Sequence, residues 1–100
     1  MSREYTKQEC IDMLMEHFVG LVSYWDGVEG SSKYKLNGLL HSILCTFDGV
    51  SGFMPAFDIV PCPHPDDKAD NIEQDSNYWP DNLHINESTY LHEIMSDYKK

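Results

Sequence analysis

Apolar side chains recur at helical spacing along residues 6–26, which predicts an amphipathic helix there. Thr6 and Glu9 have the spacing of a capping box, in which each side chain satisfies the backbone N–H of the other residue. Gly27 follows the helix, at a position where a left-handed glycine commonly ends one. The apolar positions of this segment fall on one face and are Ile11, Leu14, Met15, Phe18, Val22 and Trp25.

Residues 33–48 show the same periodicity and predict a second helix that ends at Asp48–Gly49. Gly38 lies inside this helix, where the missing side chain lets the first helix approach closely. The short Gly- and Ser-containing turn between the two segments favours an antiparallel helical hairpin. The apolar positions here are Leu36, Leu39, Leu40, Ile43, Leu44 and Phe47.

Residues 50–85 form a long, proline-containing connection with a different pattern. Residues 57–60 and 83–85 are short apolar runs that predict a small two-stranded β element. The alternating prolines of residues 61–65 predict a stiff extended segment, because each proline fixes its own φ and favours extended geometry before it. Tyr78 and Trp79 interrupt the acidic run that follows, and we expect this pair to be held against the core.

A third helix is predicted over residues 87–98, with Asn86 or Ser88 as its cap. Its apolar residues, Leu91, Ile94, Met95 and Tyr98, share one face. The sequence therefore predicts one domain over residues 1–100, of the mainly α (α+β) class. Its parts are a helical hairpin, a C-terminal helix and a possible short β element.

Net charge narrows the classes of partner. The 100 residues contain 7 Lys and Arg against 17 Asp and Glu, a formal charge of −10, which argues against direct binding to nucleic acid or to an anionic membrane. No apolar run has the length of a signal peptide or a membrane span. The odd cysteine count argues against a disulfide scaffold. We expect a protein of a reducing, cytoplasmic compartment.

The acidic residues gather in two places, a stripe on the first helix and the run over residues 66–81. Such surfaces attract basic proteins and steer their association. The sequence therefore predicts a non-catalytic binding or inhibitor protein whose basic partner, a nucleic-acid-binding protein for example, meets this acidic surface. The residues predicted to contact it are Glu9, Asp12, Glu16, Asp66, Asp67, Asp70 and Trp79.

The alternative function is that of a small zinc-dependent hydrolase. The segment Pro63-His64-Pro65-Asp66-Asp67 resembles the first zinc motif of the N-acetylglucosaminyl deacetylases over about eight residues. That resemblance implies His64 and Asp67 as zinc ligands and Asp66 as general base. A third ligand would have to be His84 or His92, and neither stands in the His-x-x-His context of that family. Lys68 stands where that family has Glu. A stiff connection without metal is the preferred interpretation, since a motif outside its structural context is weak evidence.

Two other groups of residues have competing interpretations. His41 and Cys45 are four residues apart on one helix face and could begin a metal site, although a buried structural role is favoured for this pair. Separately, exposed apolar residues could be covered by self-association in a homodimer. The candidates for such a patch are Trp25, Phe53, Met54 and Trp79.

Several segments together resemble a family of small uncharacterised proteins from bacteria and their phages. They are residues 40–49 (LHSILCTFDG), 55–57 (PAF), 61–68 (PCPHPDDK), 77–80 (NYWP) and 91–93 (LHE). The resemblance implies a phage or mobile-element setting and no particular activity. It also implies that the Pro-His-Pro-Asp-Asp segment belongs to a small fold of its own.

Overall fold

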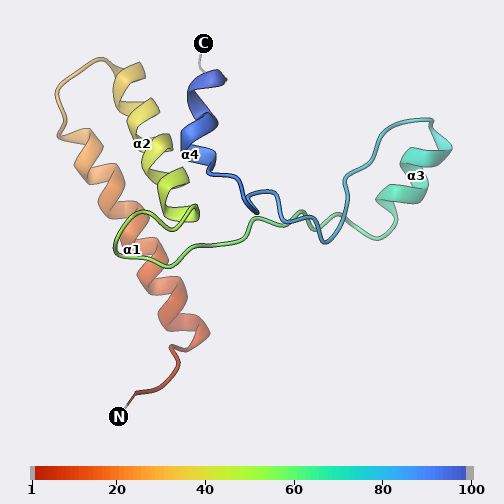
Figure 1. Cartoon of the computed structure of the whole chain (residues 1–100), viewed down its shortest axis with the longest axis horizontal. Coiled ribbons are helices and arrows are strands. Elements are labelled where there is room, and N and C mark those ends of the chain that lie inside the picture. The colour runs from red at the N-terminus through yellow and green to blue at the C-terminus, as the bar shows by residue number, and fades with distance from the viewer. Residues whose placement is uncertain (1, 99–100) are drawn as a thin grey trace.

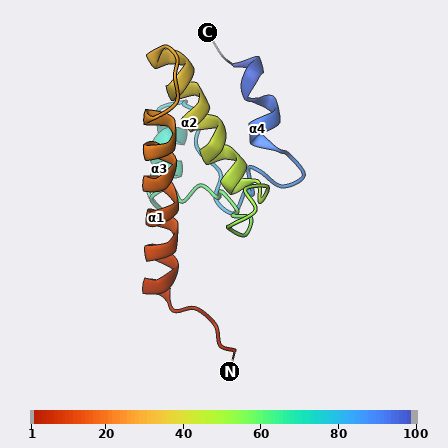
Figure 2. The same ribbon diagram turned by 90° about the vertical axis from the view of Figure 1, so that its left-hand side faces the viewer.

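A computed structural model describes residues 2–98, and within this range the chain is helical and contains no β-strand. The elements are α1 (Lys7–Asp26), α2 (Ser32–Phe47), α3 (Asp67–Glu73) and α4 (Leu91–Ile94), followed by the 3₁₀ turn η1 (Met95–Asp97). Helix α2 lies between α1 and α4 (Figures 1 and 2). The predicted helical hairpin with a C-terminal helix is confirmed.

Helix α1 begins as its sequence predicts. The Thr6 hydroxyl accepts from the Glu9 backbone N–H, and the Glu9 carboxylate accepts from the Thr6 backbone N–H at 2.9 Å, which completes the capping box. The predicted role of Gly27 is wrong, because its φ of −82° is right-handed. The left-handed glycine lies instead beyond α2, where Gly49 has φ +80°.

The contact between α1 and α2 depends on Gly38, as predicted. A Cβ at this position would lie 2.4 Å from the Trp25 ring, so only glycine leaves room for the indole. The indole Nε1–H donates to the Ser42 hydroxyl at 2.9 Å. Further along the hairpin, the fully buried Thr46 hydroxyl contacts His17 Nε2 at 2.8 Å.

The C-terminal helix is shorter than the predicted range of 87–98. Helix α4 begins at Leu91, because Ser88 adopts a left-handed conformation (φ 56°) and the Asn86 side chain bonds elsewhere. The cap comes from another element, since the Asp48 carboxylate at the end of α2 accepts from the His92 backbone N–H at 2.8 Å. Met95, in the following turn, is buried.

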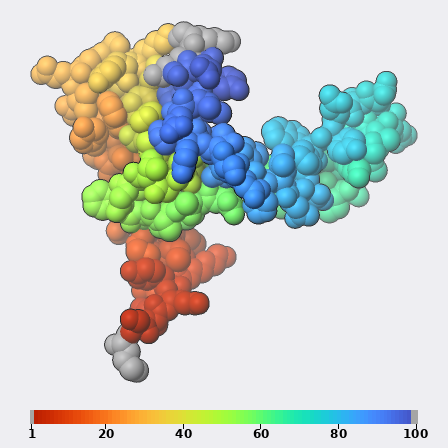
Figure 3. Space-filling view, viewed as in Figure 1, coloured from red at the N-terminus to blue at the C-terminus, as the bar shows by residue number. Residues whose placement is uncertain are grey.

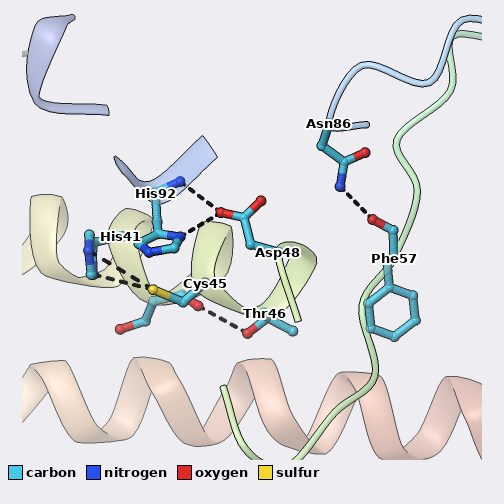
Figure 4. A network of polar contacts seen from close by, with 8 residues as sticks. His41, Cys45, Thr46, Asp48, Phe57, Asn86 and His92 are labelled. Carbon is cyan, nitrogen blue, oxygen red and sulfur yellow. Dashed lines mark hydrogen bonds and ion pairs between the residues drawn. The ribbon is translucent and has the colours of Figure 1, made fainter. Parts of the chain in front are cut away.

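The predicted β element is replaced by a side-chain clasp. Residues 57–59 and 85–86 lie side by side, but one backbone bond joins them, from Ile85 N–H to Ile59 O at 2.9 Å. The Asn86 amide makes the other two. It donates to Phe57 O at 2.7 Å (Figure 4), and it accepts from Ile59 N–H at 2.9 Å. An asparagine side chain therefore takes the place of a strand ladder.

Beyond this clasp, residues 60–84 form an arm that projects from the helical body (Figures 1 and 3). The sequence predicted no helix here, yet α3 lies at its far end. Left-handed Asp75 (φ 55°) ends α3. Asp75 N–H donates to Ile72 O, and Ser76 N–H donates to Asn71 O at 2.8 Å. This is the Schellman pattern, formed around an aspartate in place of glycine.

The chain is open in shape, with Thr46 and Met95 its buried side chains within residues 2–98. Its radius of gyration is 17.4 Å, against about 13 Å for a compact chain of 100 residues. Its accessible surface is 8182 Å², against about 5,800 Å² for a compact protein of this mass. Across residues 2–98, every helix is too short or too polar to span a bilayer.

Candidate functional site

The arm displays a dense set of carboxylates. Between residues 60 and 84 there are six acidic side chains and one lysine, so the arm carries a net charge of −5, half of the chain's −10. The lysine, Lys68, lies over the Tyr78 ring at 5.4 Å from its centroid. The carboxylates are all exposed and belong to Asp66, Asp67, Asp70, Glu73, Asp75 and Asp81.

Apolar side chains accompany these carboxylates. We expected Tyr78 and Trp79 to be held against the core, and this is wrong: Trp79 is 69% exposed and Tyr78 is 45% exposed. The arm extends away from the helices, so it offers the indole no core to pack against (Figure 3). Ile72 on α3 is exposed as well. The arm therefore presents apolar anchors within an acidic surface.

The three acidic residues of α1 are not equivalent. Glu9 is bound internally, since both its oxygens accept from the Arg3 guanidinium, at 2.7 and 3.0 Å. Arg3 first, and the Thr6 backbone second, lower the pKa of Glu9 to about 2. Asp12 accepts from Gln8 at 2.9 Å, and Glu16 is exposed. Of the predicted stripe, Asp12 and Glu16 remain accessible to a partner.

The two acidic regions do not form one face. Helix α1 lies at one side of the molecule and the arm at the other (Figure 1). The acidic residues of the arm and those of α1 therefore belong to two separate surfaces. The arm is the denser of the two acidic regions, and the exposed indole belongs to it.

The ligands of the alternative zinc site are separated. His64 lies in the arm, 3.7 Å from Asp66, and Asp67 begins α3. His92 lies on α4 in the helical body, where its Nδ1 is 2.7 Å from Asp48 Oδ2, and His84 is near Asp58. Within residues 2–98, no three His, Cys, Asp or Glu side chains converge as metal ligands. His64, Asp67 and His92 therefore do not form one site.

A second polar cluster joins α2 to α4 (Figure 4). His41 contacts the Cys45 sulfur at 3.7 Å, as their spacing predicts, and the rings of His41 and His92 lie edge to face at 5.5 Å. The Asp48 side chain is fully buried. Burial, and then the charge of Asp48, raise the pKa of Cys45. Because the thiolate is the reactive form, this cluster does not favour nucleophilic chemistry.

Asp48 acts as a structural cap in this cluster. Burial alone raises the pKa of its carboxyl, but hydrogen bonds from the backbone and ring of His92 and from the Leu91 backbone more than offset this, so the pKa lies below its ordinary value. Its Oδ1 is buried and has no hydrogen-bond partner within residues 2–98. Sequence reasoning missed this pair, since Asp48 and Gly49 signalled only the end of a helix.

The function of this chain is inferred from the geometry of its residues. Neither the protein-family models, nor the curated proteins, nor the solved structures include a match to this chain.

Proposed function

We propose that this chain is a non-catalytic binding protein of the bacterial cytoplasm, which docks its acidic arm on a basic partner protein. The observation that supports this function best is the exposure of six carboxylates and Trp79 on one projecting segment. Exposed apolar side chains that are rimmed by polar residues commonly mark a protein interaction site, and Trp79, Tyr78 and Ile72 lie among the carboxylates of the arm.

The arm combines the two contributions that a protein interface uses. Asp67, Asp70 and Glu73 follow each other by three residues along α3, a spacing that places their Cβ atoms about 5–6 Å apart. Such a cluster attracts a basic surface over a distance and accelerates encounter. Trp79 and Ile72 supply apolar area, and buried aromatic residues commonly dominate binding energy. The carboxylates would set the rate of association, and burial of the indole would set the lifetime of the complex.

The class of partner follows from this chemistry. A basic protein surface that normally binds nucleic-acid phosphates is complementary to closely spaced carboxylates. The arm would compete with nucleic acid for such a surface, so an inhibitor or adaptor role fits it. The resemblance to small bacterial and phage proteins is compatible with a role of this kind.

The test is affinity capture from nuclease-treated bacterial lysate over a salt series. The bait is the full chain, compared with an arm variant (Asp66→Asn, Asp67→Asn, Asp70→Asn) and with Trp79→Ala. The matched control is an α1 variant, Asp12→Asn with Glu16→Gln, which removes accessible acids elsewhere. Circular dichroism confirms that each variant retains its helices.

We expect one basic protein to bind the parent chain and the α1 control, and to be released steeply as salt rises. The arm variant should lose it, and Trp79→Ala should weaken binding while leaving its salt dependence unchanged. Retention of the same protein by the arm variant, or release from the α1 control alone, would refute the proposal.

A further inference from the structure

Helix α1 is apolar over a wider arc than α2 covers. Ile11, Met15 and Val22 belong to the apolar face that the sequence predicts for α1, yet all three are exposed. The side chains partly buried in the hairpin lie on a neighbouring face and are Met13, Leu14, His17, Phe18, Leu21 and Trp25. The other half of the arc faces solvent.

This exposed half forms one continuous stripe. Its residues, Ile11, Met15, Val19 and Val22, follow each other by four, four and three positions, so they align along a single helix face. Their exposed fractions are 38%, 54%, 64% and 54%. The stripe extends over about 16 Å of helix. A surface helix normally turns such a face toward protein.

The surface area of the chain indicates how much of it a partner could cover. Its accessible surface exceeds that of a compact monomer of 11.6 kDa by about 2,400 Å². The projecting arm accounts for part of this excess. An obligate homodimer removes about 1,000–2,500 Å² from each chain, which is of the same order as this excess.

We infer that α1 pairs with α1 of a second copy of this chain, in antiparallel orientation. In such a pair Ile11 of one copy lies level with Val22 of the other, so an apolar residue stands at each end of both stripes. Lys7 then lies at the same end of the pair as Asp26 of the second copy, which places opposite charges together. A parallel pair would set Asp12 beside Asp12. Two-fold pairing of this kind closes and leaves no unpaired stripe.

The dimer differs from partner binding in its response to salt. Each chain carries a charge of −10, so two copies repel and salt screens that repulsion. The apolar stripe itself is insensitive to moderate salt. Dimer formation is therefore unchanged or stronger as salt rises, whereas binding through the acidic arm weakens. Because the dimer test contains no partner, its failure is distinguishable from failure of the proposed function.

Sedimentation over a concentration and salt series tests the pairing. The parent chain is expected at about twice 11.6 kDa, and Val19→Glu should raise the dissociation constant of the dimer at least tenfold. Leu36→Glu is the matched control, since Leu36 is 65% exposed on α2 outside the stripe. A parent chain that stays monomeric, or a dimer lost with Leu36→Glu and kept with Val19→Glu, would overturn the inference.

Cross-linking tests the orientation. In a chain whose three cysteines are replaced by serine, Ile11→Cys and Val22→Cys are prepared separately, then mixed and oxidised. An antiparallel pair gives the mixed disulfide and little of either homodimer. A parallel pair gives both homodimers, and that result contradicts the antiparallel assignment. Circular dichroism of each variant shows whether α1 remains folded.

Discussion

Replacing Gly38 with alanine tests the closest contact between α1 and α2. The added Cβ would lie 2.4 Å from two carbons of the Trp25 ring and 2.7 Å from a third. Carbon atoms pack best at about 3.5–4.0 Å, so the ring must retreat by about 1 Å. That retreat stretches the bond of 2.9 Å from the indole to Ser42.

The magnitude follows from three contributions to the free energy of unfolding. Overpacking a tight contact costs about 1–3 kcal/mol, and a weakened hydrogen bond costs about 1 kcal/mol. Alanine in a helix interior recovers about 1 kcal/mol relative to glycine. We therefore expect Gly38→Ala to destabilise the chain by about 2 kcal/mol.

Gly20→Ala is the matched control, because a Cβ at Gly20 meets no atom within 4 Å. It keeps the full propensity gain, so it should stabilise the chain by about 1 kcal/mol. Urea unfolding followed by far-ultraviolet circular dichroism, at one protein concentration, measures both variants. If Gly38→Ala proves as stable as Gly20→Ala, the hairpin does not pack through Gly38 and Trp25 as described.

Three further substitutions test single polar contacts. Asp48→Asn should weaken the protection of α4 against hydrogen exchange. The pKa of Asp48 is lowered in the folded state, so its carboxylate stabilises the fold above its unfolded pKa of about 3.8, and this stabilisation is lost as the pH falls below that value. The protection of α4 in the parent chain should therefore also fall below about pH 3.8. Asn86→Ala removes two hydrogen bonds, so amide exchange at the base of the arm should rise while that of α2 is unchanged. Thr46→Val should lower the free energy of unfolding by about 1–3 kcal/mol, since it leaves His17 Nε2 without its partner; Thr46→Ser should restore most of it.

Local signals predicted α1 and α2 well. The capping box of Thr6 and Glu9 and the glycine at position 38 depend on neighbours within a few residues or on one helix–helix contact. Which half of the α1 arc packs inward is a different matter. It depends on where α2 lies, so the sequence groups Val22 with Phe18 on one apolar face but does not reveal that Val22 stays exposed.

The remaining differences have non-local causes. The start of α4 is set by Asp48, 44 positions before His92 in the chain, and a cap from another element has no local sequence signature. The Asn86 side chain bonds to the backbone of Phe57, 29 positions earlier in the chain, and takes the place of backbone hydrogen bonds between two strands. Trp79 was expected against the core because, with Tyr78, it interrupts the acidic run, but the arm turns away from the core. Of the predicted binding residues, Glu9 is bound by Arg3, a contact that composition does not reveal.

The clasp at the base of the arm has a consequence for how this chain tolerates insertions. Asn86 bonds to Phe57 and Ile59, and so closes the arm where it leaves the helical body. Loop-closure entropy grows only slowly with length, by about 0.6 kcal/mol for each doubling. Residues added between positions 61 and 84 should therefore barely change the unfolding midpoint of the helices. The arm is a site at which a foreign recognition peptide could be spliced into a stable carrier.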